Sequence, residues 1–299
     1  MNMTLLKGRL VLWLTALLWG TSCVILKNTL DSIGVLWLLA FRFLGAALLL
    51  CAFAGGRLGR MDRQTFVGSV LMGLSLAAAY ISQTFGLRYT TPGKNSFLTA
   101  IYCVLVPFLA WLFYRRRPNA AQVFSALLCF AGVGLVSLDT VEGGLNFGDW
   151  LTLLCGIFYA MQIIIMERYI RDGAGDPVAI SAVQFCATAA VCLSGALLFE
   201  PFPVGLRLSV WLTLGYLSAV VTALCFFLQA VGLRWTPAST ASIILSFEAV
   251  FGVLSSVLFF HERLSGKLIF GFFLIFCAVI LAETGEMLLK RLLHTSYNG

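Results

Sequence analysis

Long apolar stretches, separated by short polar turns, make up almost the whole sequence. Each contains roughly 17 to 23 residues, the length that an α-helix needs to cross a hydrocarbon core of ~30 Å. Transmembrane β-strands are about ten residues long and alternate in polarity, whereas these stretches are apolar throughout. The sequence therefore predicts an all-α integral membrane protein. Its ten transmembrane helices are expected near residues 10–27, 33–54, 66–87, 95–114, 121–138, 149–167, 178–199, 208–230, 239–260 and 267–283.

The composition also indicates a chain that is embedded in a lipid bilayer. Hydrophobic residues make up 60% of the sequence and charged residues 11%, and the mean hydropathy is +0.96. Soluble domains have about 25% charged residues. The net charge of +7 does not call for nucleic acid, because Lys and Arg in loops are attracted to the anionic inner leaflet. We expect a lipid bilayer as partner and no nucleic acid.

The positive residues are unevenly divided between the two sides of the predicted helices. Loops on one side hold most of the Lys and Arg residues, including the run Arg115-Arg116-Arg117. By the positive-inside rule this side is cytoplasmic. No small-x-small cleavage site follows the first apolar stretch, which is therefore interpreted as a helix and not as a secretory signal. The prediction is a multi-pass protein of the bacterial inner membrane with both termini in the cytoplasm.

One pattern occurs twice in the chain. Residues 83–135 align without a gap with residues 229–281. Identical residues at equivalent positions include Gln83/Gln229, Gly86-Leu87-Arg88/Gly232-Leu233-Arg234, Thr90/Thr236, Ser96/Ser242 and Leu112-Phe113/Leu258-Phe259. Weaker matches extend toward the N-terminus. An internal repeat of this length indicates two equivalent halves, each with five helices.

Five helices in each half have a geometric consequence. Because the number is odd, the second half enters the membrane from the opposite side, and the halves are related by an axis in the membrane plane. Such inverted repeats are typical of secondary transporters. We predict a first repeat at residues 1–138, an external linker at 139–148, a second repeat at 149–285 and a cytoplasmic tail at 286–299.

Short motifs in both halves carry a resemblance to a known family. They are Leu-Leu-Trp-Gly at 17–20, Arg42-Phe43, Gly-Leu-Arg-Tyr-Thr at 86–90, Phe-Glu-Ala-Val-Phe at 247–251 and His-Glu-Arg-Leu-Ser at 261–265. In these motifs the chain resembles the drug/metabolite transporter superfamily, EamA type. The resemblance implies a ten-helix secondary transporter of small organic solutes working by alternating access. The cargo it favours is an amino acid or related metabolite, with export as the direction; drugs or sugar-type metabolites are the alternative cargo.

Two ionisable residues lie deep in predicted helices. Arg42 is roughly eight residues, or about 12 Å, into its helix, and Glu248 is near the middle of the stretch 239–260. A charge at this depth costs roughly 2.5 to 3.5 kcal/mol, so it must face a partner, water or substrate. Arg42 could bind a substrate carboxylate or phosphate, and Glu248 could be a proton site. The structural alternatives are an ion pair or snorkelling toward a helix end for Arg42, and a carboxyl group of Glu248 that is neutral or paired, for instance with Arg42.

Amide and aromatic side chains complete the candidate substrate site. They are Gln83, Gln184, Gln229, Trp19, Tyr80, Tyr102 and Tyr159. Each could instead serve only in packing or in hydrogen bonds between helices, but several occupy matching places in the two halves. We expect a central cavity lined by the first four helices of each half, with the fifth and tenth helices as an outer scaffold.

No cofactor, metal site or catalytic cluster is expected. The nine cysteines lie inside apolar stretches without the spacing of metal ligands, and no phosphate-binding Gly-x-x-x-x-Gly-Lys-Ser/Thr loop occurs. A membrane-embedded transferase would need grouped acids or histidines and longer loops. A channel would need a ring of equivalent charges. A transporter is therefore the favoured class, as a monomer or a homodimer.

Overall fold

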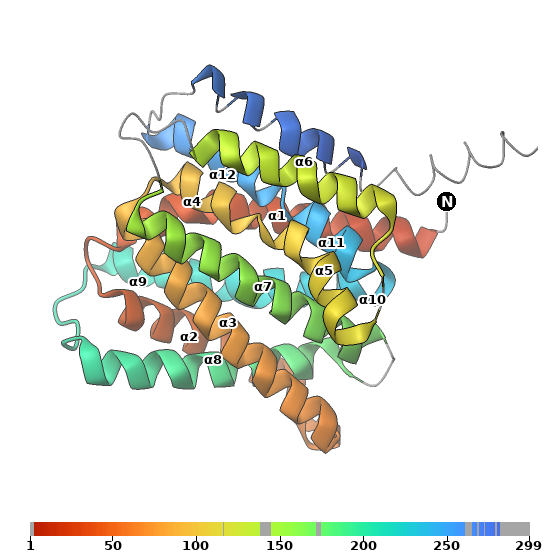
Figure 1. Ribbon diagram of the computed structural model, residues 1–299. Helices are drawn as coiled ribbons and strands as arrows, with labels where there is room; N and C mark the ends of the chain where they lie inside the picture. The colour runs from red at the N-terminus through yellow and green to blue at the C-terminus, as the bar shows by residue number, and fades with distance from the viewer. Residues whose placement is uncertain are drawn as a thin grey trace, which may run out of the picture.

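The computed structural model describes residues 3–115, 117–137, 145–171, 175–260, 265–267, 269–271, 273–278 and 280–281. All regular structure within these residues is helical, and the helices form one bundle (Figure 1). Eight helical segments in the described part are long and apolar enough to cross a membrane, and two shorter apolar helices accompany them. The predicted all-α membrane fold with ten helices is confirmed. Residues 139–144 of the predicted linker and the predicted tail lie outside the described residues.

The first half of the chain contains the elements α1 (Met3–Thr29), α2 (Val35–Ala54), the 3-10 helix η1 (Gly55–Arg60), α3 (Arg63–Tyr89), α4 (Pro92–Thr99), α5 (Tyr102–Tyr114) and α6 (Ala120–Ser137). The second half contains α7 (Phe147–Arg171), α8 (Pro177–Phe199), α9 (Leu208–Tyr216), the π-helix η2 (Leu217–Leu224), α10 (Cys225–Trp235), α11 (Ala238–Leu245) and α12 (Glu248–Phe260). A shorter helix at Ile269–Ala278 follows.

In each half the fourth span is broken into two helices. In the first half α5 begins at Tyr102, and in the second half α12 begins at Glu248. These two residues occupy the same position in the alignment of the repeats. Helices interrupted in this way are typical of substrate sites in secondary transporters, because they place helix ends inside the protein.

The two halves pack closely against each other. Helix α3 lies against α7 and α8, α2 lies against α8, and α1 lies against α10 and α12. Glycine residues allow the closest contacts between helices of the two halves. A Cβ atom on Gly20 would lie 2.6 Å from the carbonyl oxygen of Glu248. Helices α1 and α12 can therefore pack this closely only because residue 20 has no side chain. The buried core therefore lies between the halves.

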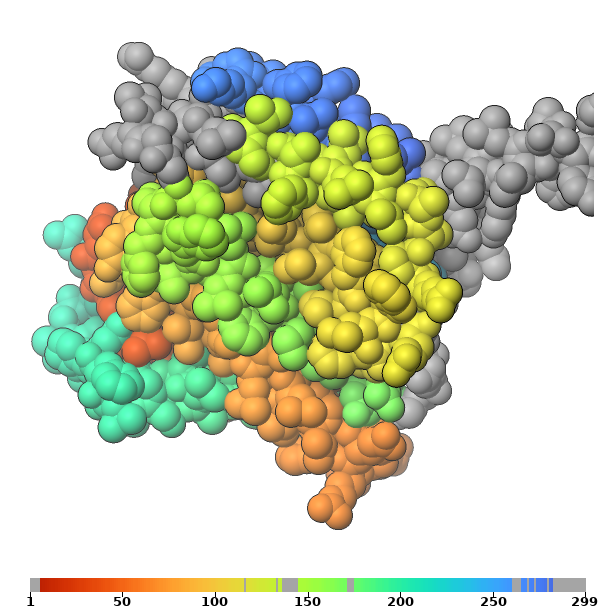
Figure 2. Space-filling model, in the orientation of Figure 1, coloured from red at the N-terminus to blue at the C-terminus, as the bar shows by residue number. Residues whose placement is uncertain are grey.

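The fifth and tenth helices lie together at one side of the bundle. Figure 1 shows α6 beside the helix near residue 275, and a Cβ atom on Gly132 of α6 would lie 2.8 Å from the carbonyl oxygen of Gly271. Leu127 and Phe130 of α6 point outward and are exposed, as lipid-facing residues are. On the face shown in Figure 2, side chains of α3, α5, α6 and α7 form a continuous surface. This arrangement agrees with a peripheral role for α6 and its counterpart.

Candidate functional site

Arg42 is held at the boundary between the two halves. Its side chain is only 2% exposed. Nε donates a hydrogen bond to Oγ1 of Thr222 in η2 at 2.6 Å, and a terminal nitrogen donates to the hydroxyl of Tyr80 in α3 at 3.2 Å. The guanidinium carbon also lies 4.6 Å from the centroid of the Tyr80 ring, a cation–π distance. A guanidinium has five N–H donors, so Arg42 retains donor capacity for an anionic group.

Glu248 approaches the same region from the second half. It is the first residue of α12, immediately after the break in the ninth span. The N-terminal end of a helix carries partial positive charge, which favours a carboxylate at this position. No ion pair joins Glu248 to Arg42 in the described part of the chain. The two charged groups are therefore not paired with each other.

A small enclosed cavity separates these groups. Its volume is about 20 Å³, enough for one water molecule but far below the ~300 Å³ of a typical ligand pocket. The residues that line it are Trp19, Ser22, Cys23, Leu26, Arg42, Tyr80, Gln83, Ser96, Tyr159 and Glu248. The cavity in this structure is too small to hold a solute.

The cavity brings together six of the nine candidate residues. These are Trp19, Arg42, Tyr80, Gln83, Tyr159 and Glu248. They come from α1, α2, α3, α7 and α12, with Ser96 of α4 beside them. Helices α8 and α10, which were also expected to line the cavity, contribute no lining residue among those described. The candidates on these two helices therefore lie away from it.

Aromatic rings form a continuous wall on one side of the cavity. The ring centroids of Tyr80 and Tyr159 are 5.4 Å apart, and those of Trp19 and Phe226 are 5.0 Å apart. The Trp19 indole donates a hydrogen bond to a backbone carbonyl of η2 at 2.9 Å. Tyr102 does not line the cavity but packs on Tyr159 at 6.1 Å. The wall is well placed to contact an apolar or cationic part of a solute.

The remaining amide candidates form a separate hydrogen-bonded chain. Gln162 of α7 donates to Oε1 of Gln184 at 3.0 Å and accepts from Nε2 of Gln229 at 3.5 Å. Nε2 of Gln184 and Oε1 of Gln229 are buried without a hydrogen-bond partner in the part of the chain that the structure describes. Sequence reasoning missed Gln162, although an amide inside an apolar stretch is itself a recognisable signal.

Gln83 differs from these amides because it borders the cavity. Its Nε2 donates to Thr99 Oγ1 at 3.0 Å, and its Oε1 accepts a hydrogen bond from the Tyr159 hydroxyl at 3.4 Å. Ser96 was not selected as a candidate either, yet it lines the cavity. Its identity with Ser242 in the repeat alignment was the signal that could have identified it.

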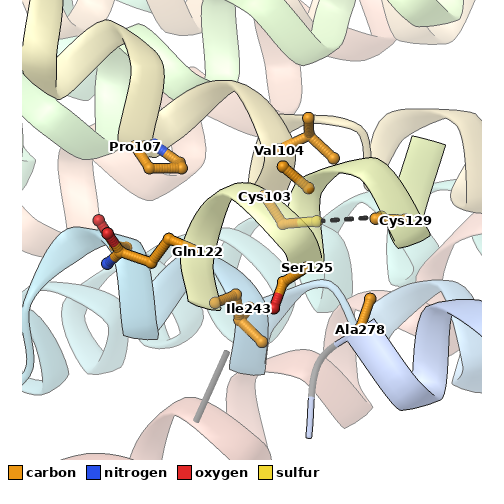
Figure 3. Close-up of a pocket in the computed structure, with 10 residues that line it drawn as sticks. Cys103, Val104, Pro107, Gln122, Ser125, Cys129, Ile243 and Ala278 are labelled. Carbon is orange, nitrogen blue, oxygen red and sulfur yellow. Dashed lines mark hydrogen bonds between the residues drawn. The ribbon is translucent and has the colours of Figure 1, made fainter. Parts of the chain in front are cut away.

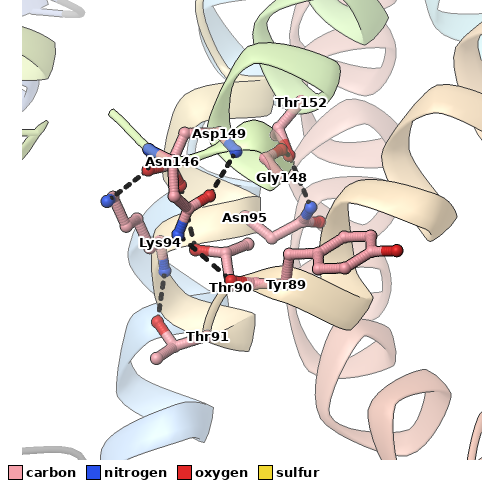
Figure 4. A network of polar contacts seen from close by, with 9 residues as sticks. All are labelled: Tyr89, Thr90, Thr91, Lys94, Asn95, Asn146, Gly148, Asp149 and Thr152. Carbon is pink, nitrogen blue, oxygen red and sulfur yellow. Dashed lines mark hydrogen bonds and ion pairs between the residues drawn. The ribbon is translucent and has the colours of Figure 1, made fainter. Parts of the chain in front are cut away.

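A buried polar network closes the end of the bundle where α3 ends and α7 begins (Figure 4). Nζ of Lys94 lies 2.5 Å from Oδ2 of Asp149, and the side chains are 8% and 0% exposed. Asp149 also accepts hydrogen bonds from Thr90 Oγ1 at 3.0 Å and from the Asn146 backbone at 2.9 Å. Nearby, Lys27 donates to backbone carbonyls at the end of α3. The network links the first half to the second.

A second small cavity lies between α5, α6, α11 and the helix near residue 275 (Figure 3). Its volume is about 10 Å³, at the lower limit for a single water molecule. The sulfur atoms of Cys103 and Cys129 lie 3.4 Å apart at its edge, and both cysteines are free. No group of three or more potential metal ligands occurs among the described residues. This space is a packing feature of the scaffold.

The chain matches one family profile and is similar to several transporters. The profile described as "EamA-like transporter family" matches residues 6–138 and again residues 146–284. An "uncharacterized transporter" of Archaeoglobus fulgidus is 32% identical over 278 residues, covering 93% of this chain and 86% of that protein. The "uncharacterized transporter YvbV" of Bacillus subtilis is 25% identical, with 93% and 92% covered. A solved crystal structure with 20% identity superposes with a TM-score of 0.73 over 92% of this chain and 96% of its own.

Proposed function

The chain belongs to the EamA-like transporter family, and we propose that its cargo is a small zwitterionic solute, an amino acid or related metabolite, which it exports. It is a membrane transporter and not an enzyme, as its family and relatives indicate. The observation that carries the proposal is the placement of Arg42 and Glu248. Opposite charges from different halves border one cavity without pairing with each other.

A zwitterion fits this pair of charges. The carboxylate of an α-amino acid would accept hydrogen bonds from the remaining N–H groups of Arg42, a geometry that guanidinium favours. The ammonium group would face Glu248 and the aromatic wall of Tyr80 and Tyr159. A solute with only one charge would leave the other buried group without a partner, which is costly in a dry site.

Transport would proceed by alternating access. The cavity lies between the halves, and inverted repeats rock about such a site to expose it to each side in turn. In the present conformation the cavity is too small for a solute, and the Lys94–Asp149 pair joins the halves at one end. Access from that end would require this pair to separate.

The test is solute exchange in proteoliposomes. Vesicles containing the purified protein are loaded with one unlabelled amino acid, and entry of a labelled one is followed for a panel of zwitterionic, anionic, cationic and neutral solutes. We expect saturable exchange of zwitterions that is lost in Arg42→Gln. The control is the same substitution at Arg88, which is exposed at the C-terminal end of α3 and does not line the cavity. Equal exchange of neutral solutes, or intact exchange in Arg42→Gln, would contradict the proposal.

A further inference from the structure

An apolar groove lies between α2 and the segment η2–α10, far along the bundle from the Lys94–Asp149 network. Its volume is about 400 Å³, much larger than the central cavity. Leu49 and Phe53 of α2 form one wall, and Ala219, Ala223 and Phe227 form the other. Because several of these side chains are exposed, the groove opens toward the surrounding lipid.

Small residues of η2 leave the groove unfilled. Helices α2 and η2 touch at Gly45, where a Cβ atom would lie 2.8 Å from Oγ of Ser218. Beyond that contact, Ala219 and Ala223 present only methyl groups, so the space beside them is not filled from the second half. Segments of π-helix occur frequently at functional sites.

The groove continues into a basic pocket. A second cavity, also of about 400 Å³, is lined by Arg57, Arg60, Thr65 and Asp176, and Arg57 borders both cavities. Arg57 and Asp176 form an ion pair at 3.7 Å with exposed side chains. An exposed pair of this kind is weak, and Arg57 has further N–H donors. The pocket at the end of the apolar groove is therefore lined by two guanidinium groups and one carboxylate.

We propose that the groove and the basic pocket together bind one anionic phospholipid. An acyl chain would lie in the groove between Phe53 and Ala223, and the phosphate would accept hydrogen bonds from Arg57 and Arg60. Guanidinium groups bind phosphate in a bidentate manner, and basic pockets between transmembrane helices are known to hold anionic headgroups. A lipid with an ammonium headgroup brings a positive charge to two arginines and is disfavoured.

Occupancy of this site would act on the region that holds Arg42. The lipid would contact α2 from the first half and η2 from the second. These are the two elements that the Arg42–Thr222 hydrogen bond joins. A bound lipid would therefore stabilise the arrangement of the halves described above.

Lipid binding to the purified, delipidated full-length protein in detergent tests the inference directly. Native mass spectrometry compares phosphatidylglycerol with phosphatidylcholine of the same acyl chains. We expect tighter binding of phosphatidylglycerol and a loss of about tenfold in the double variant Arg57→Gln/Arg60→Gln. The matched control is Arg234→Gln, an exposed arginine at the same end of the bundle that borders neither cavity. Filling the groove by Ala219→Phe should weaken both lipids.

Three results would overturn the inference. They are equal binding of the two lipids by the unmodified protein, unchanged binding of phosphatidylglycerol in the double arginine variant, and unchanged binding of both lipids in Ala219→Phe, which would show that the apolar groove contributes nothing. Thermal unfolding midpoints of all variants verify that they are folded. The assay measures lipid binding and not transport, so a negative result does not contradict the proposed cargo.

Discussion

The ammonium group of Lys94 lies 2.5 Å from the carboxylate of Asp149, and the two residues belong to different halves of the chain. Both side chains are buried, and the carboxylate also accepts hydrogen bonds from Thr90 and Asn146. The central cavity also lies between the halves. The pair therefore links the two halves at one end of this interface.

Breaking this pair from one side should destabilise the protein strongly. Lys94→Met leaves the buried carboxylate of Asp149 without its partner, and such losses amount to about 3 to 5 kcal/mol. We expect a large fall in the thermal unfolding midpoint in detergent. The double variant Lys94→Met/Asp149→Leu removes both charges and should recover most of the loss. A double variant that is less stable than Lys94→Met would contradict this role for the pair.

Substituting Arg42 by lysine should weaken substrate binding while preserving the charge. Lysine lacks the planar fork of donors that holds Thr222 and Tyr80. Hydrogen bonds to charged groups contribute about 1.5 to 3 kcal/mol, so the half-saturating concentration in exchange should rise about tenfold to a hundredfold. Arg88→Lys is the control. An unchanged half-saturating concentration in Arg42→Lys would place Arg42 outside the substrate site.

The orientation in the membrane can be tested by labelling single cysteines. The loops that hold Arg57 and Arg115 carry an excess of positive charge, which indicates the cytoplasmic side. In a variant without the nine native cysteines, a cysteine at position 57 should react with a membrane-impermeant thiol reagent only after the cells are permeabilised. One at position 144 should react in intact cells. Labelling of position 144 only from the cytoplasm would reverse the predicted topology.

The fold was predictable because length and polarity alone determine which segments can cross a bilayer. Arg42 and Glu248 were equally visible, since a charge inside an apolar stretch is costly and stands out. The Lys94–Asp149 pair was not foreseen, because both residues lie near the ends of apolar stretches, where charges are common. The helix breaks before Tyr102 and Glu248 were also not foreseen. Neither break contains proline or glycine, the usual marks of an interrupted helix.

Glu248 is the candidate for coupling transport to a proton gradient. It begins α12, borders the central cavity and makes no ion pair among the described residues. Replacing it with glutamine keeps the shape of the side chain but fixes a neutral form. In exchange the transporter carries solute in both directions, so Glu248 need not bind or release a proton. Net transport driven by a pH gradient, in contrast, requires the carboxyl group to gain and lose a proton.

We therefore expect Glu248→Gln to exchange solute in proteoliposomes at saturating concentrations, with a raised half-saturating concentration because a neutral amide binds the ammonium group more weakly, while losing its response to an imposed pH gradient. Both assays are run on the same vesicles, with Glu200→Gln as a control. Glu200 caps α2 through the backbone N–H groups of Leu36 and Trp37 and lies away from the cavity. Its variant should lose some thermal stability but keep both activities. Complete loss of exchange in Glu248→Gln, even at saturating solute, would assign the residue a structural role, and gradient-driven transport at the unmodified rate would exclude it from coupling.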